Sequence, residues 1–253
     1  MKKNCLLCFL LFFSCHSALA GESLDSLLNV LDKTIKEADT YVQIKENKLH
    51  ELKKEARKTP PFSVERYNLN NDIYLEYKAY SSDSALHYLN ENMLLARQFN
   101  DKERELKIQL ELSYLLSSIG MYMEAADILN SIDRQTLPSS LLGHYYTCYE
   151  HVYFEAGAAQ PRYKMFASRY VKLSHAYRDS MQITLDPSSA TYLWLRETQL
   201  REAGKYDEAL EFSDRRLAES SFGTPQYALV AYQRFRLFES MGKKDEHLYY
   251  LVL

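Results

Sequence analysis

The stretch Gly204–Phe212 constrains the fold more than any other part of this chain, because it has the pattern of a turn between two packed helices. Glycine permits a sharp chain reversal, since it adopts positive φ without a steric penalty. Tyr206 is placed to close the end of the helix pair. Ala209 is small enough for the preceding helix to cross at short range. The stretch therefore predicts a helical hairpin.

The same pattern recurs upstream, with the glycine at Gly120, the tyrosine at Tyr122 and the small residue at Ala125. Alanines at this packing position are spaced by 40, 42 and 42 residues, although the glycine and tyrosine are missing before the first and third. A helix pair cannot bury its apolar face alone and must stack on its neighbours, so this spacing predicts one repeat array. The four packing alanines are Ala85, Ala125, Ala167 and Ala209.

These glycine, tyrosine and alanine offsets resemble the tetratricopeptide repeat (TPR) family, clearly at Gly120–Ala125 and Gly204–Ala209 and more weakly over roughly residues 63 to 253. The spacing exceeds the family period of about 34 residues, so we expect longer helices or connections. The resemblance implies an all-α, right-handed superhelical solenoid of α-α hairpins. A plain array of α-hairpins is the alternative and predicts nearly the same layout.

Helical periodicity and capping residues divide residues 60–253 into helix pairs, the last one incomplete. Pro225 follows a capping threonine, and Pro161 is a favoured residue for a first helical turn. The expected helices are Val64–Tyr80, Ser84–Phe99, Asp101–Ile119, Tyr122–Ile132, Leu141–Ala156, Pro161–Met181, Ala190–Ala203, Tyr206–Ser220, Gln226–Ser240 and Asp245–Leu253.

Residues 21–59 form a separate segment in which apolar side chains follow a heptad. The pattern favours a long coiled-coil-like helix that ends at Thr59, before two prolines. A capping signal at Asp39 and Thr40 would instead divide it into two helices. Its mixed charges predict a solvated face. The seam is Leu24, Leu28, Leu31, Ile35, Ala38, Val42, Leu49, Leu52 and Ala56.

Residues 1–20 have the pattern of a secretory signal peptide. Lys2 and Lys3 precede an apolar run, Cys5–Phe13, and Ala18–Ala20 is a small-x-small cleavage site. The run is much shorter than the roughly 20 residues of a membrane span. Lipoprotein processing at Cys15 is the alternative, and an uncleaved anchor is a third.

Cysteine content and charge argue against a disulfide-stabilised protein and against a nucleic-acid-binding protein. Cys5, Cys8 and Cys15 lie within residues 1–20, so cleavage leaves Cys148 alone, and we expect it to be a buried small residue rather than part of a disulfide. The net charge of −3 gives no basic excess, so no nucleic acid is expected to bind this segment.

Candidate catalytic and metal chemistry is weak. His144, Cys148 and His151 share one helix face, but the two histidines lie about 10 Å apart along the axis, so we expect no metal site. No phosphate-binding loop or nucleophile turn is present. The sequence predicts no catalytic residue, no cofactor and no enzyme activity.

In TPR arrays the first helix of each pair lines a concave groove, so the resemblance implies a partner-binding groove on two of the expected helices. Trp194 is the only tryptophan, and its alternative role is a core anchor. The implied groove residues are Lys107, Leu110, Tyr114, Trp194, Thr198 and Arg201.

The last expected helix, Asp245–Leu253, would leave apolar residues without a polar cap, which predicts a fragment of a longer protein or a docking end. With the export signal, the layout resembles the exported, periplasmic half of membrane-tethered TPR transcriptional regulators, which implies a sensory scaffold for a protein or peptide partner. Self-association is expected through the heptad helix or the C-terminal end. Membrane attachment would come from a C-terminal continuation or from Cys15. The alternatives are an envelope assembly adaptor or lipoprotein and, less favoured, a glycan-binding helical-repeat protein.

Overall fold

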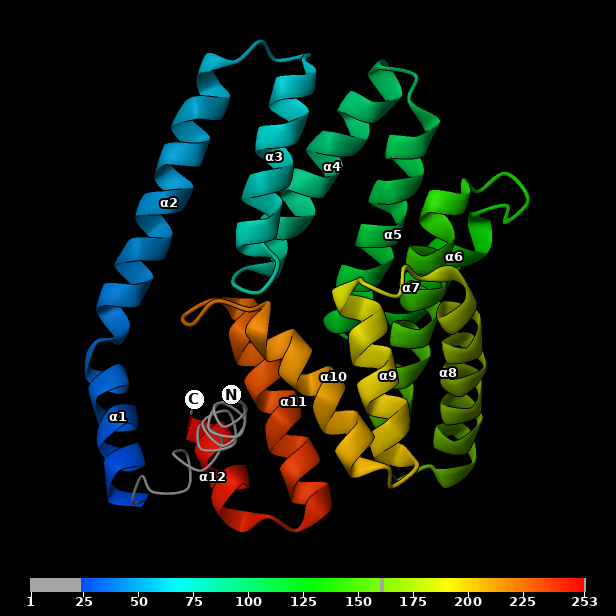
Figure 1. Cartoon of the computed structure of the whole chain (residues 1–253). Helices are drawn as coiled ribbons and strands as arrows, with labels where there is room; N and C mark the ends of the chain where they lie inside the picture. The colour runs from blue at the N-terminus through cyan, green and yellow to red at the C-terminus, as the bar shows by residue number, and fades with distance from the viewer. Residues whose placement is uncertain (1–23, 160–161, 253) are drawn as a thin grey trace, which may run out of the picture. The chain divides into compact units, whose positions relative to one another are not determined.

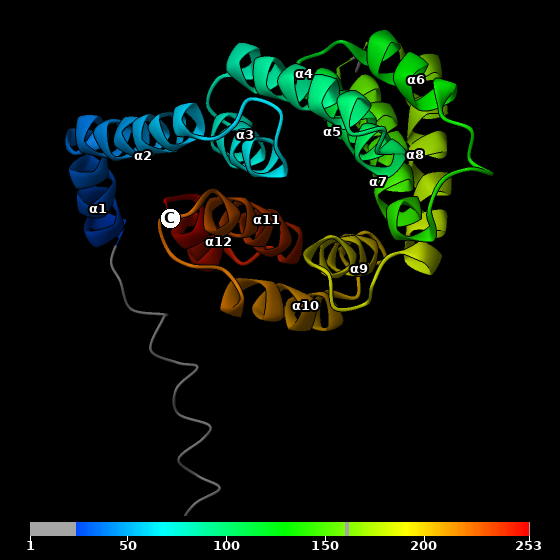
Figure 2. The same ribbon diagram turned by 90° about the horizontal axis from the view of Figure 1, so that it is seen from above.

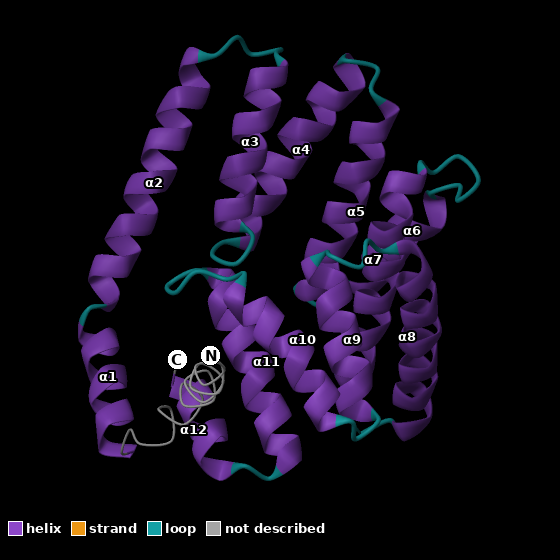
Figure 3. Ribbon diagram, in the orientation of Figure 1, coloured by secondary structure: helices purple, strands orange, loops and turns teal. Residues whose placement is uncertain are grey.

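The computed structural model describes residues 24–159 and 162–252, and its regular secondary structure there is entirely helical (Figure 3). The expected all-α fold of stacked hairpins is confirmed. The expected signal peptide lies outside the described residues. Helices α1–α12, labelled in Figure 1, are Leu24–Lys36, Ala38–Lys58, Val64–Tyr77, Ser82–Gln98, Lys102–Ser118, Tyr122–Ser131, Ser139–Ala158, Lys164–Thr184, Ala190–Glu202, Tyr206–Ala218, Pro225–Met241 and Lys244–Val252.

The chain divides into two compact units. The larger unit spans residues 42–195 and holds most of α2, the hairpins α3–α4, α5–α6 and α7–α8, and the start of α9. The smaller unit combines residues up to 41 with residues 196–253, and holds α1, the end of α9, and α10 to α12.

The heptad segment forms two helices, α1 and α2, which meet at Glu37. The prediction of a single long helix was therefore wrong, and the two-helix alternative is right. The break comes two residues before the expected cap at Asp39. Two seam residues of α2, Leu49 and Ala56, are buried in the core that also contains residues of α3 and α4. The second half of the heptad therefore packs within its own chain, whereas the seam residues Leu28, Leu31, Ile35 and Val42 are exposed.

The three hairpins of the larger unit stack in sequence. In each, the two helices pack against each other, and the turned view of Figure 2 shows the hairpins following one another from α3 to α8. Helix α5 packs against α4, α6 and α7, so it is covered on several sides. One core lies between α2 and the first two hairpins, and a second lies around α5 to α9. Buried tyrosines contribute to both cores.

The two clearest turns have the geometry that the glycine pattern requires. Gly120 and Gly204 have φ of 88° and 73°, a left-handed conformation in which other residues are strained. Ala125 and Ala209 have no exposed surface, and the carbonyl of Ala125 accepts a hydrogen bond of 3.0 Å from the Ser113 hydroxyl on α5. The small residue thus lies where α5 and α6 cross.

The weaker repeats differ from each other. Ala85 has no exposed surface, but Ala167 is only half-buried. Helix α8 begins at Lys164, later than the expected start at Pro161, which lies outside the described residues. The closest approach of α7 to the end of α8 lies at Gly143, where a Cβ would lie 3.2 Å from the carbonyl oxygen of Thr184 and 2.8 Å from Cδ2 of Leu185.

Buried ion pairs join the helices of two hairpins. In the larger unit, Glu150 of α7 accepts hydrogen bonds from Arg178 (2.8 Å) and Ser174 (2.9 Å) of α8. In the smaller unit, Arg216 of α10 donates to Glu197 of α9 at 2.5 Å, and both side chains are almost fully buried. Neither partner can be removed without leaving a charge in the interior.

The last hairpin, α11–α12, begins as its sequence predicts. The Thr224 hydroxyl accepts a hydrogen bond from the backbone of Tyr227, Pro225 follows, and Gly242 ends α11 with φ of 71°. Helix α12 also contacts α1 within the smaller unit. Among residues 24–159 and 162–252, no helix combines the length and apolarity that a membrane span needs.

Candidate functional site

Polar and aromatic side chains gather on the first helices of three successive hairpins. The first hairpin contributes Tyr74 of α3 and Lys78, the residue that caps the end of α3. Helix α5 contributes Glu111 and Tyr114, and α7 contributes two histidines. We name this set the Glu111 cluster; its members are Tyr74, Lys78, Glu111, Tyr114, His144 and His151.

The carboxylate of Glu111 is the centre of the cluster. Tyr74 donates its hydroxyl to Oε2 at 2.6 Å, and Lys78 donates to the same oxygen at 3.0 Å. Nε2 of His144 lies 3.6 Å from Oε1, beyond hydrogen-bond length. Burial opposes ionisation of Glu111, but the charges of Lys78 and His144 and the Tyr74 hydrogen bond outweigh it, so the pKa of Glu111 is lowered. The cluster therefore holds an ionised carboxylate between three helices.

Tyr114 and His151 form the aromatic part of the cluster. Their rings stack with centroids 4.0 Å apart and an interplanar angle of 9°. The ammonium group of Lys78 lies over the Tyr114 ring, 4.6 Å from its centroid, which is a cation–π contact. The Ser118 hydroxyl lies 2.9 Å from Nε2 of His151. These contacts hold the rings of Tyr114 and His151 and the ammonium group of Lys78 together in one half-buried surface.

The three residues considered as a metal site have separate partners. Cys148 is fully buried and donates its thiol to the carbonyl of Leu110 at 3.3 Å, and burial raises its pKa. His144 faces Glu111, and His151 stacks on Tyr114. In the described part of the chain, no group of three or more His, Cys, Asp or Glu side chains is arranged to hold a metal ion.

The sequence-predicted groove residues have different environments. In the larger unit Lys107 is exposed, Tyr114 is half-buried in the cluster, and Trp194 is half-buried against the second core. The prediction for Leu110 is corrected, because it has no exposed surface and lies in the core that α5 shares with α6 and α7. In the smaller unit Thr198 is buried and Arg201 half-buried. Of the predicted groove residues in the larger unit, Lys107 and Tyr114 are therefore the two that lie on α5 at or beside the Glu111 cluster.

Tyr74, Lys78 and Glu111 were not predicted as site residues from the sequence. One pattern in the sequence does indicate a polar face. Residues four or seven positions apart share one face of a helix, and the pairs Tyr74 with Lys78 and His144 with His151 have this spacing. Only the stacking of the hairpins shows that these faces adjoin.

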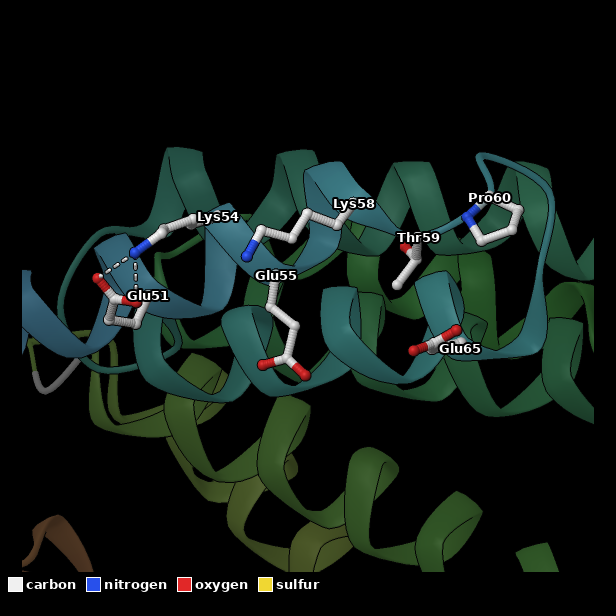
Figure 4. Close-up of a pocket in the computed structure, with 7 residues that line it drawn as sticks. All are labelled: Glu51, Lys54, Glu55, Lys58, Thr59, Pro60 and Glu65. Carbon is white, nitrogen blue, oxygen red and sulfur yellow. Dashed lines mark hydrogen bonds and ion pairs between the residues drawn. The ribbon is translucent and has the colours of Figure 1, made fainter.

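A second surface feature lies between the end of α2 and the start of α3, where Figure 4 shows an open depression. Its lining carries both charges in nearly equal number, and Lys54 pairs with Glu51 at 3.1 Å within it. No polar group there converges on one point, so the depression offers no defined ligand chemistry. Its lining residues are Glu51, Lys54, Glu55, Lys58, Thr59, Pro60 and Glu65.

The burial of His151 predicts a dependence of stability on pH. Burial lowers its pKa to about 4, from about 6.5 in an unfolded chain. The unfolded chain therefore binds more protons than the folded chain between these two pH values. The stability of the fold is fully present above about pH 6.5 and falls as the pH drops towards 4.

His151→Phe preserves the stacking on Tyr114 and should remove on the order of 1–3 kcal/mol of this pH dependence. Urea unfolding at pH 7 and pH 4.5 measures it; His175→Phe, at an exposed position on α8, is the control, and an unchanged pH profile in His151→Phe would refute the assignment.

The family described as "SusR N-terminal TPR domain" matches residues 35–253. Among the curated proteins none matches. The family match begins near the end of α1 and covers every helix that contributes to the Glu111 cluster.

Proposed function

Because the chain belongs to the family of SusR N-terminal TPR domains, we propose that it is the exported sensory part of a membrane-tethered transcriptional regulator. It binds a protein or peptide partner without catalysis, and it works in the periplasm or at the cell envelope. The family description supports a role in a regulator, and the TPR architecture supports a role in protein–protein interaction.

The observation that carries this proposal is the Glu111 cluster on the first helices of three hairpins. A partner segment lying across α3, α5 and α7 meets hydrogen-bonding groups from Lys78 and Glu111 and a ring face from Tyr114. Lys107 lies one helical turn before Glu111 on α5 and is exposed, which extends the face. Tyrosine is one of the residue types that are enriched at binding hot spots.

A sensory role requires that binding favours one state of the regulator over another, since a ligand shifts an equilibrium only by its differential affinity. The contacts of Glu111 join three hairpins through side-chain hydrogen bonds and charge. A partner that competes for Lys78 or His144 changes these contacts between hairpins. In this proposal the change is passed along the stack to the rest of the regulator.

The proposal is tested in cells that carry the complete regulator and its target promoter fused to a reporter. Lys107→Glu reverses one charge on the proposed face and should change induced reporter output by about tenfold, equivalent to about 1.4 kcal/mol of binding. The matched control is Lys172→Glu, an exposed lysine on α8, the second helix of its hairpin. The control should change output by less than about twofold, as a neutral surface substitution does.

Immunoblots establish that both variants accumulate to the same level. Equal output from both variants at equal protein level would contradict the proposed face. A larger effect at Lys172 than at Lys107 would place the partner on the second helices instead.

A further inference from the structure

We infer that the first half of α2 is a switchable link between the two compact units. It is helical while Glu76 of α3 pairs with Lys45 and Lys48, and it becomes a flexible chain when these pairs are broken. We name this half, residues 38–48, the α2 arm. The boundary between the two units falls within it. The inference goes beyond the proposed partner face, because none of the three paired residues belongs to the Glu111 cluster.

The α2 arm has no apolar side chain in a core. Every residue of the arm is exposed except Lys45, which is half-buried. The second half of the same helix is anchored, because Leu49 and Ala56 are buried in the core that also contains residues of α3 and α4. A helix shorter than about 12–15 residues is marginal in water unless an apolar face packs on the protein. The three β-branched residues of the arm lower its helix propensity further.

Polar contacts join the arm to the end of α3. Lys45 and Lys48 pair with the two carboxylate oxygens of Glu76, at 2.5 and 2.6 Å. The Tyr80 hydroxyl donates a hydrogen bond of 2.7 Å to Glu46. Burial opposes ionisation of Glu76, but the hydrogen bonds and charges of both lysines outweigh it, so the pKa of Glu76 is lowered. One ionised carboxylate therefore holds the arm at two points.

The pairing with Glu76 is specific. Asp72 lies one turn before Glu76 on α3 and is exposed, yet both lysines pair with Glu76. Glu46 on the arm is bonded to Tyr80, so the arm itself carries both charges and has no large excess of either. Lysine in place of Glu76 would put a third ammonium group beside the first two, which exchanges attraction for repulsion.

The other helix that crosses the boundary between the units has a different environment. In α9 the boundary follows Leu195, and Leu193, Leu195 and Glu197 are all buried. Glu197 is also paired with Arg216 of α10. This link is packed before and after the boundary, so it stays helical when the α2 arm changes state. The chain therefore joins its two units by one packed link and one switchable link.

Hydrogen exchange of the purified full chain, followed by mass spectrometry, tests the inference. In Glu76→Lys the amides of residues 42–48 should exchange about tenfold faster than in the unsubstituted protein, while those of residues 49–58 keep their rate. Glu91→Lys makes the same chemical change at an exposed position on α4 and should alter neither segment. The triple variant Lys45→Glu/Lys48→Glu/Glu76→Lys reverses both pairs and should restore the protection of residues 42–48.

Other results would overturn the inference. Unchanged exchange of residues 42–48 in Glu76→Lys would show that the ion pairs do not hold the arm. Equal acceleration of residues 42–48 and 49–58 would show that α2 opens as one helix without a separate arm. A triple variant that stays unprotected would show that the substitution acts through the folding of α3 rather than through charge. The partner face is tested separately, by the reporter output of Lys107→Glu.

Discussion

Replacing Arg216 by Met should lower the free energy of unfolding by about 3–5 kcal/mol, because the substitution leaves the carboxylate of Glu197 buried without its partner. The two side chains lie 2.5 Å apart on α9 and α10 and are almost fully buried. Methionine fills much of the arginine volume, so the loss reports the missing charge rather than a cavity. Urea unfolding followed by circular dichroism measures the change.

Two further variants make this result specific. Lys205→Met removes an exposed i,i+3 pair with Glu208 at the start of α10 and should cost less than about 0.5 kcal/mol. The double variant Glu197→Met/Arg216→Met removes both charges and should be more stable than Arg216→Met alone. A loss below about 1 kcal/mol for Arg216→Met would show that Glu197 is hydrated or neutral, and would contradict the buried ion pair.

Replacing Ala209 by Leu should destabilise the protein by about 1–3 kcal/mol, because extra methylene groups in a filled helix crossing force neighbouring side chains from their preferred rotamers. Ala209 has no exposed surface and packs in a core with Leu200 and Leu237. The same chemical change at Ala218, an exposed position at the end of α10, is the matched control. Unfolding midpoints in urea compare the two.

Ala218→Leu should stay within about 0.5 kcal/mol of the unsubstituted protein, as surface substitutions usually do. Similar midpoints for Ala209→Leu and Ala218→Leu would mean that position 209 has room for a larger side chain. The close approach of the helices at this position would then be wrong.

Most of the fold could be predicted because its signals are local. Glycine at Gly120 and Gly204 and the threonine cap at Thr224 each act within one turn, and the helices begin and end close to where such residues predict. The break between α1 and α2 was harder to place, because Glu37 carries no proline or glycine signal. The heptad pattern was correctly recognised, but periodicity alone cannot distinguish packing on another copy from packing on α3 and α4.

The candidate site was only partly predictable because its contacts are not local. Tyr74 and Lys78 reach Glu111 across 37 and 33 residues of sequence, so no short pattern brings them together. Leu110 was placed in the groove because the TPR resemblance assigns the first helix of each pair to it. Helix α5 packs on α4, α6 and α7, which leaves only a narrow part of it accessible and buries Leu110.

Site-specific photo-crosslinking in cells that carry the complete regulator tests the central claim most directly, namely that the partner binds the first-helix face around Glu111. With p-benzoylphenylalanine at position 107 we expect a crosslinked adduct that appears under inducing conditions, and with the same residue at position 172 we expect none. An adduct at position 172 and none at position 107, with both proteins present at equal level, would contradict the account.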